Sequence, residues 1–103
     1  MDIQSMRYAV TLAEELHFGR AARRHHISAQ PFGRRIRRLE RELGRPLFHR
    51  TSRRVTLTPA GESFIRRARA VLAEIDELIA SVHAESARRF PEEERACVSL
   101  LRK

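Results

Sequence analysis

The side chains best suited to chemistry in this sequence are the arginines between residues 28 and 41. On a helix with about 100° per residue, five polar side chains share one face: Gln30, Arg34, Arg37, Arg38 and Arg41. The planar guanidinium group of arginine suits guanine edges and phosphates. The segment 28–39 holds four arginines and no carboxylate, whereas a merely solvated helix usually mixes both signs. The pattern therefore favours contact with a polyanion over a solvated charged face.

Two helices joined by a tight turn, over about residues 18–43, are expected to position this face. The first helix is short. We expect Gly19 to be its N-cap and the small pair Ala21-Ala22 to approach a neighbouring helix closely. The turn is predicted at His26-Ile27. This is the layout of a helix-turn-helix that reads DNA.

The second helix has clear start and stop signals. The hydroxyl of Ser28 is expected to cap its N-terminus, Pro31 lies in its first turn, and Gly44 suits a left-handed C-terminal cap. Its apolar side chains are spaced four, three and four residues apart: Phe32, Ile36, Leu39 and Leu43. They fall within a sector of about 60° opposite the arginines. One face is therefore predicted to be core and the other to be the recognition surface.

The positive charge is concentrated in the first part of the chain. Residues 1–60 contain thirteen arginines and five acidic residues, whereas residues 61–103 contain eight cations and eight acidic residues. The formal net charge of +8 therefore lies in the predicted recognition part. Twenty of the 21 cations are arginine, a bias that genome base composition explains equally well, so it identifies no partner alone.

The composition excludes several classes of protein. A chain of 103 residues, 42% of them hydrophobic, is expected to form one domain with a small core. It has neither a secretory signal nor an apolar stretch of about 18 residues, so we expect a cytoplasmic protein without membrane contact. Cys97 is the only cysteine, which rules out a disulfide within the chain.

Catalytic and metal-binding motifs are also missing from the sequence. The five histidines lack the spacing of metal ligands: His17, His25, His26, His49 and His83. The hydroxyl side chains have no Gly-x-Ser-x-Gly elbow around them, and no glycine loop suited to phosphate is present. We therefore expect no metal, no cofactor and no enzymatic activity.

Two further elements are expected to flank the helix-turn-helix. A helix from about Asp2 to Leu16 is predicted to turn an apolar stripe inward: Ile3, Met6, Val10, Ala13 and Leu16. The pattern of residues 47–57 predicts a small hairpin. As a wing, this hairpin would bring Arg50, Arg53 and Arg54 to the sugar-phosphate backbone or the minor groove, and a basic surface loop is the alternative. The fold class predicted for residues 1–58 is therefore mainly α, a winged helix-turn-helix.

A long helix is predicted over residues 59–89, with Thr58 as its N-cap and Pro59 at its first position. Its apolar side chains repeat at intervals of three and four: Ile65, Ala68, Leu72, Ile75, Ile79 and Val82. Such a seam needs a partner, either its own domain or a second subunit. We expect a dimer, because the predicted winged helix-turn-helix already has three helices to close its core. In addition, helix-turn-helix proteins commonly pair so that two recognition helices contact two half-sites. Residues 90–103 are expected to form a short tail, either helical or frayed.

An ordered set of short motifs runs through residues 2–85: Arg7-Tyr8, Ala13-Glu14-Glu15-Leu16-His17-Phe18, Arg20-Ala21-Ala22, Ile27-Ser28, Ile36-Arg37-Arg38-Leu39-Glu40, Leu43-Gly44, Leu47-Phe48-His49-Arg50-Thr51 and Val55-Thr56-Leu57-Thr58-Pro59-Ala60-Gly61-Glu62. Together they resemble the LysR-type transcriptional regulators. The resemblance implies a winged helix-turn-helix that binds an interrupted palindrome in double-stranded DNA. It also implies a linker helix that pairs antiparallel with that of a second subunit, giving a homodimer or a higher oligomer.

Carried over by position, the resemblance implies DNA contacts from the recognition helix and the wing: Ser28, Gln30, Pro31, Gly33, Arg34, Arg35, Arg37, Arg38, Arg50, Arg53 and Arg54. Arg34 is the strongest candidate for a contact with a base edge. Three features depart from the family pattern. Gln30 and Pro31 are displaced by one position, Gly33 stands where serine is common, and His25 stands where an apolar residue is usual, which predicts looser packing of the short helix.

Regulators of this family continue into an effector-binding domain, which these 103 residues do not include. We therefore expect no small-molecule effector site, in either a fragment or a naturally short protein. The leading hypothesis is a DNA-binding and dimerisation module that recognises a specific sequence. The alternatives are a dimerisation-only modulator that captures a full-length regulator, and a non-specific nucleic-acid binder.

Overall fold

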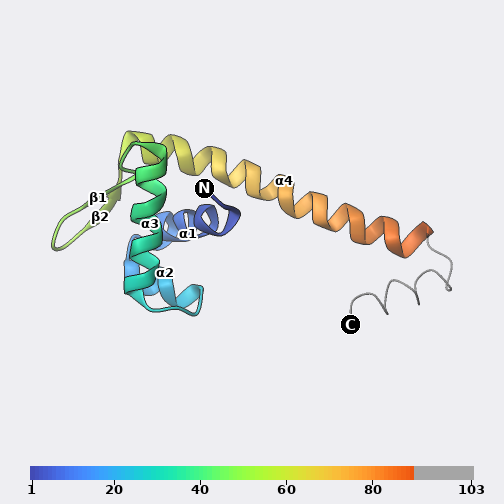
Figure 1. Cartoon of the computed structure of the whole chain (residues 1–103), viewed down its shortest axis with the longest axis horizontal. Coiled ribbons are helices and arrows are strands. Elements are labelled where there is room, and N and C mark those ends of the chain that lie inside the picture. Colours follow the sequence, from blue (N-terminus) through green and yellow to red (C-terminus); the bar gives the residue numbers. More distant parts are fainter. Residues whose placement is uncertain (90–103) are drawn as a thin grey trace. The chain divides into compact units, whose positions relative to one another are not determined.

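The computed structural model describes residues 1–89, with side chains up to residue 85. Its elements follow in chain order: α1 (Ile3–Glu15), α2 (Phe18–Arg24), α3 (Ala29–Leu43), β1 (Phe48–Arg50), β2 (Val55–Leu57) and α4 (Pro59–Arg89). Figure 1 shows these helices and the hairpin. A mainly helical chain with one antiparallel hairpin confirms the predicted fold class. The predicted tail, including Cys97, lies outside the described residues.

The chain divides into two compact units, one up to Leu72 and one from Ala73 onwards. We predicted a boundary at residue 58, but the first unit extends further because the start of α4 packs into it. Ile65, Ala68 and Leu72 are all buried. The first half of the predicted seam is therefore covered by its own domain. Among the described residues, no helix has both the length and the apolar character needed to cross a membrane.

The core of the first unit forms where α1, α2 and α3 meet the start of the hairpin. Its largest fully buried side chains are Leu12, Phe32, Ile36, Leu39 and Leu47. Ala21-Ala22 is buried, as predicted, so α2 can approach its neighbours closely. Leu43 is 37% exposed, contrary to its predicted place in the core. It is the last residue of α3, beyond which the chain turns away at Gly44.

The buried face of α1 differs from the predicted stripe. Its buried residues are Ser5, Met6, Tyr8, Ala9, Thr11 and Leu12. Ile3 and Leu16 are exposed, and Val10 and Ala13 are only partly buried. Helix α1 packs against both α2 and α3, so a broad sector of its surface is covered instead of one narrow stripe.

The N-cap of α2 is His17, and the prediction of Gly19 was wrong. His17 Nδ1 accepts a hydrogen bond from the Arg20 backbone N–H at 3.0 Å. Gly19 lies inside the first turn, where a Cβ atom would approach the His17 ring to 3.0 Å. Glycine therefore makes room for the imidazole cap. The predicted turn follows, with His26 at a φ of 58°.

Helix α3 starts after Ser28 and ends at Gly44, as predicted, but its N-cap hydrogen bond differs from the prediction. Within the described part of the chain, the Ser28 side chain makes no cap hydrogen bond. Pro31 is the third residue of the helix and has no N–H, so it removes one of the two backbone donors that a cap hydroxyl can bind. Gly44 adopts the left-handed conformation, with a φ of 74°, and its N–H bonds back to the last turn.

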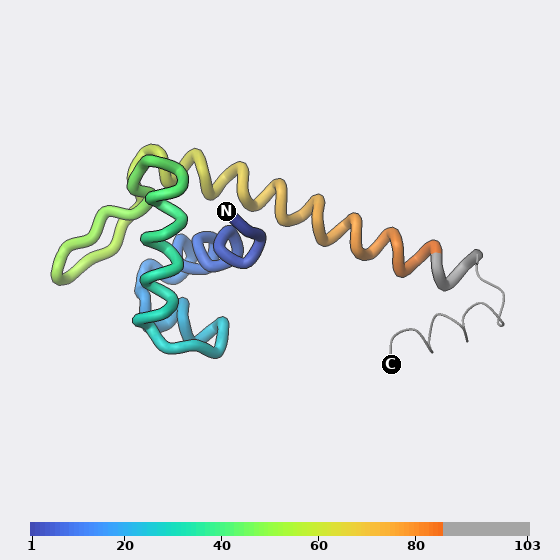
Figure 2. Tube along the Cα trace, in the orientation of Figure 1, coloured from blue at the N-terminus to red at the C-terminus, as the bar shows by residue number. Residues whose placement is uncertain are grey.

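The predicted hairpin over residues 47–57 is confirmed, with β1 and β2 antiparallel and Phe48 opposite Leu57. Figure 2 shows the hairpin leading from the end of α3 to the start of α4. The tip is closed by Thr51, whose backbone N–H donates to the Arg54 carbonyl at 2.9 Å. The Thr51 hydroxyl also accepts the Arg54 N–H at 3.1 Å.

The base of the hairpin is tied to α4 by the predicted cap residue Thr58. Its hydroxyl accepts the Gly61 backbone N–H at 2.9 Å and donates to the Pro46 carbonyl at 2.7 Å. Its own backbone N–H donates to the Leu47 carbonyl at 3.0 Å. One residue therefore both starts the helix and holds the two ends of the hairpin together.

Candidate nucleic-acid interface

The exposed face of α3 carries the polar side chains that the sequence placed there. Gln30, Arg34 and Arg37 are all exposed. Within residues 1–89, no ion pair joins Arg34 or Arg37 to an acidic side chain. Their donors therefore point to solvent with no internal partner to displace, which is the state in which a recognition helix meets a groove.

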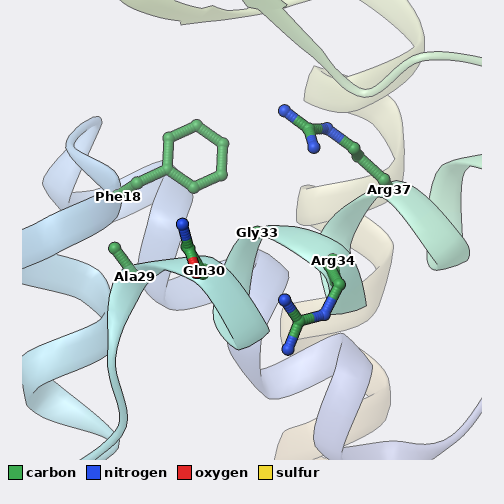
Figure 3. Close-up of a pocket in the computed structure, with 6 residues that line it drawn as sticks. All are labelled: Phe18, Ala29, Gln30, Gly33, Arg34 and Arg37. Atoms are coloured by element: carbon green, nitrogen blue, oxygen red, sulfur yellow. The ribbon is translucent and has the colours of Figure 1, made fainter.

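A depression of about 530 Å³ lies on this face, lined by Phe18, Ala29, Gln30, Gly33, Arg34 and Arg37. Figure 3 shows the Phe18 ring and the Arg37 side chain on either side of Gly33. A Cβ atom at Gly33 would lie 3.9 Å from the Phe18 ring, an ordinary contact distance. The glycine is therefore not forced by crowding, and it leaves the depression open.

The N-terminus of α3 adds a second feature to this surface. Ser28 is exposed and Pro31 is half-buried at the start of the helix. Helix N-termini attract anions through their unpaired N–H groups and the helix dipole. Because the Ser28 side chain makes no cap hydrogen bond in the described part of the chain, its hydroxyl is available to an external acceptor.

Two of the predicted contact residues on α3 have internal partners. Arg35 donates to the Asp2 carboxylate at 3.0 Å and lies 5.4 Å from the Tyr8 ring centroid. The side chain of Arg38 forms an i,i+4 pair with Glu42 at 3.2 Å but remains 74% exposed. Arg35 is thus held against α1, while Arg38 stays on the accessible face.

The Asp2 carboxylate also caps α1, where it accepts the Ser5 N–H at 2.7 Å. These interactions, the Ser5 hydrogen bond first and the Arg35 guanidinium after it, lower the pKa of Asp2 to about 2. One carboxylate therefore both starts α1 and fixes Arg35 from α3.

The wing arginines divide into two kinds. Arg53 and Arg54 are exposed at the tip of the hairpin. Arg50 is different: its side chain is 27% exposed and donates to Glu40 Oε1 at 2.7 Å. Its guanidinium lies 5.1 Å from the centroid of the Phe18 ring. The structure therefore brings Arg50 to α2 and α3, and leaves Arg53 and Arg54 to reach outward.

His25, noted as unusual in the sequence, is part of a polar contact in the core. Its Nε2 lies 2.8 Å from Thr11 Oγ1, and its ring centroid lies 4.6 Å from that of Tyr8. The Thr11 hydroxyl donates to the Arg7 carbonyl at 3.0 Å, so His25 must be the donor in the His25–Thr11 bond. Burial, followed by the charges of Arg24, His26 and Arg7, lowers the pKa of His25.

Sequence reasoning missed two residues of this region. Glu40 joins α3 to the hairpin, and Phe18 forms a wall of the depression. Glu40 carried a signal, because it is the lone carboxylate on an arginine-rich segment from residue 34 to residue 41. Phe18 carried none beyond its position at the start of the helix-turn-helix.

The candidate dimer residues in the second half of α4 are more accessible. Ile79 and Val82 are 50% and 57% exposed, and Ile75 is half-buried. Leu78, which the seam did not include, is 64% exposed. These four side chains share one face of the helix. The exposed apolar stripe is therefore residues 75, 78, 79 and 82.

A helix-turn-helix with an arginine-bearing second helix and a basic hairpin beside it defines the class of winged helix-turn-helix proteins. A family model described as bacterial regulatory helix-turn-helix protein, lysR family, matches residues 3–62. The chain therefore belongs to the LysR family.

Known proteins of this family are similar over most of the chain. The uncharacterized transcriptional regulator YnfL of Escherichia coli strain K12 is 44% identical over 80 residues, which cover 78% of this chain and 27% of YnfL. The chain thus spans about a quarter of the length of that relative. The relatives are transcription regulators, not enzymes.

Two solved structures are also similar. Full-length OxyR from Pseudomonas aeruginosa gives a TM-score of 0.78 at 40% identity, over 82% of this chain and 28% of OxyR. The BenM DNA-binding domain in complex with catB site 1 DNA gives 0.83 at 33% identity, over 87% of this chain and all of that chain.

Proposed function

We propose that this chain binds double-stranded DNA of specific sequence, as the DNA-binding and dimerisation module of a bacterial LysR-type transcription regulator. The observation that carries the proposal is the exposed face of α3, where Gln30, Arg34 and Arg37 surround an open depression. The chain is similar, over 87% of its length, to a BenM DNA-binding domain solved in complex with DNA. DNA binding places the protein in the cytoplasm, where the bacterial chromosome lies.

The residues divide by the part of DNA that they would contact. Gln30 and Arg34 lie on α3 where a recognition helix meets base edges, so they supply sequence discrimination. Arg53 and Arg54 at the hairpin tip contact the phosphate backbone or the minor groove. Ser28, Pro31, Arg37 and Arg38 position α3 in the groove.

Dimerisation through α4 follows from its exposed stripe at residues 75, 78, 79 and 82. As the resemblance to the LysR-type regulators implies, we expect two copies of α4 to pair antiparallel through this stripe. Two recognition helices held in this way address an interrupted palindrome.

Incubation of the chain with sheared bacterial genomic DNA, followed by sequencing of the bound fragments, tests the function. We expect recurrent peaks that share a motif. Uniform coverage would contradict sequence-specific binding and leave a non-specific binder. The dimerisation-only alternative predicts no bound DNA and mixed dimers with a full-length relative, which size-exclusion chromatography of the mixture detects.

A further inference from the structure

The carboxylate of Glu40, on the recognition helix α3, is hydrogen-bonded to the hairpin. Its Oε2 accepts the backbone N–H groups of Leu47 and Phe48 at 2.7 and 3.1 Å. Its Oε1 accepts from Arg50 at 2.7 Å, and its side chain is only 12% exposed. Backbone N–H groups have fixed directions, so these bonds set both the position and the orientation of β1 relative to α3.

Arg50 extends this connection to α2. Its guanidinium lies 5.1 Å from the centroid of the Phe18 ring, which lines the depression on α3. The ring of Phe18 packs edge-on against Phe32 in the core, with centroids 6.3 Å apart. The Arg50 Nε atom is buried, so the guanidinium faces the protein. Glu40, Arg50 and Phe18 thus form one line of contacts through three elements.

A carboxylate beneath a DNA-binding surface repels phosphate, so its presence calls for another role. We propose that Glu40 is a positioning residue for DNA binding: it fixes the wing on the recognition helix and holds Arg50 over Phe18. In this role Arg50 sets the position of the wing and does not bind phosphate. The inference rests on the proposed function, since it states how the wing arginines Arg53 and Arg54 are held ready for DNA.

The two roles of Arg50 predict opposite effects of Glu40→Gln. This substitution removes one negative charge, which raises the net charge by one, and releases Arg50. If Arg50 bound phosphate, DNA binding would tighten. If Glu40 positions the wing, binding weakens, by about tenfold when a hydrogen-bonded charge pair is lost. The matched control is Glu42→Gln, which makes the same change in net charge on the same helix but removes only surface pairs with Arg38 and the chain N-terminus. We expect its binding to be unchanged or tighter.

The measurement is fluorescence anisotropy of the full chain on one labelled duplex at fixed salt, with circular dichroism and thermal melting to verify folding. The same comparison is made in an Arg53→Ala/Arg54→Ala background. In that background we expect Glu40→Gln to have little further effect, because the arginine side chains that Glu40 positions, Arg53 and Arg54, have been removed. A merely structural role for Glu40 would instead give losses that add.

Two results would overturn the proposal: Glu40→Gln binding as tightly as the parent or tighter, or additive losses in the double background. If Glu40→Gln does not fold, Glu40→Asp replaces it. Aspartate keeps the charge but is too short to reach all three donors, and the same weakening is expected. Failure of the proposed function looks different, since the parent chain would then show no preference among duplex sequences.

Discussion

Gly61 packs so closely against Leu47 that a Cβ atom on the glycine would overlap the Leu47 carbonyl oxygen. That carbonyl also accepts the Thr58 N–H, at 3.0 Å. The contact seats the hairpin on the first turn of α4. The close approach of two backbones requires glycine here, since no side-chain movement can relieve the overlap.

Gly61→Ala is therefore expected to destabilise the fold by about 2 kcal/mol or more, as overpacking against rigid backbone does. The measurement is the free energy of unfolding in urea, followed by circular dichroism. The control is Gly33→Ala, because Gly33 is also helical but has ordinary space around its Cβ position. It should stabilise the chain by about 0.5–1 kcal/mol. Equal effects of the two substitutions would contradict the packing at Gly61.

The stability of the chain should depend on pH through His25. Because the pKa of His25 is lowered in the folded state, the unfolded chain binds more protons than the folded chain between the lowered pKa and the ordinary value of 6.5. The free energy of unfolding therefore falls as the pH drops below 6.5, the ordinary value, and the fall ends at the lowered pKa.

The matched variant is His25→Gln, which still donates to Thr11 but does not titrate. It should remove this part of the pH dependence in thermal melts. The low pKa of Asp2, about 2, acts in a separate range: its stabilisation is present above 3.8 and is lost as the pH falls towards 2. A pH dependence near 6.5 that survives in His25→Gln would refute the role of His25.

Arg34→Ala and Arg53→Ala should weaken DNA binding in different ways. Loss of a base-edge contact by Arg34 is expected to cost about 1–3 kcal/mol at one position of the site and to relax the preference there. Arg53→Ala should weaken all sequences alike and flatten the salt dependence of binding. Binding titrations on single-base variants of a selected duplex, at several salt concentrations, separate the two. A uniform loss from Arg34→Ala would argue against base reading.

A charged residue in the exposed stripe of α4 should separate the subunits. Ile79→Glu places a carboxylate in the apolar seam, and we expect a monomer at micromolar concentration in sedimentation velocity. Ile75→Glu is expected to act in the same way. Ala80→Glu is the control, since residue 80 is exposed and lies on the opposite side of the helix. If Ile79→Glu remains dimeric, the stripe is not the dimer interface.

Much of the fold could be predicted from the sequence because its signals are local. The apolar spacing of α3, the left-handed Gly44 and the Thr58 cap each act within a few residues. Two cap predictions failed for reasons that are also local but easily missed. An imidazole at His17 serves as an acceptor, and Pro31 removes one of the two backbone N–H groups that the Ser28 hydroxyl can bind.

The site was harder to predict, because periodicity treats all arginines alike. Arg35 is paired with Asp2, 33 positions away in sequence, and Arg50 with Glu40, 10 positions away. Only the folded chain brings these partners together. The same limit applies to the apolar seam of α4. Ile65 and Leu72 are buried in the first unit, whereas Ile79 is exposed. Dimerisation through that stripe stays a prediction.

The most direct test of sequence-specific binding by a dimer is selection of duplexes from a randomised DNA library at near-physiological salt, followed by sequencing of the enriched pool. We predict an interrupted motif with two-fold symmetry, its half-sites spaced for two α3 helices on one side of the duplex. A pool without enrichment would contradict specific recognition, and a single unpaired half-site would contradict the dimer.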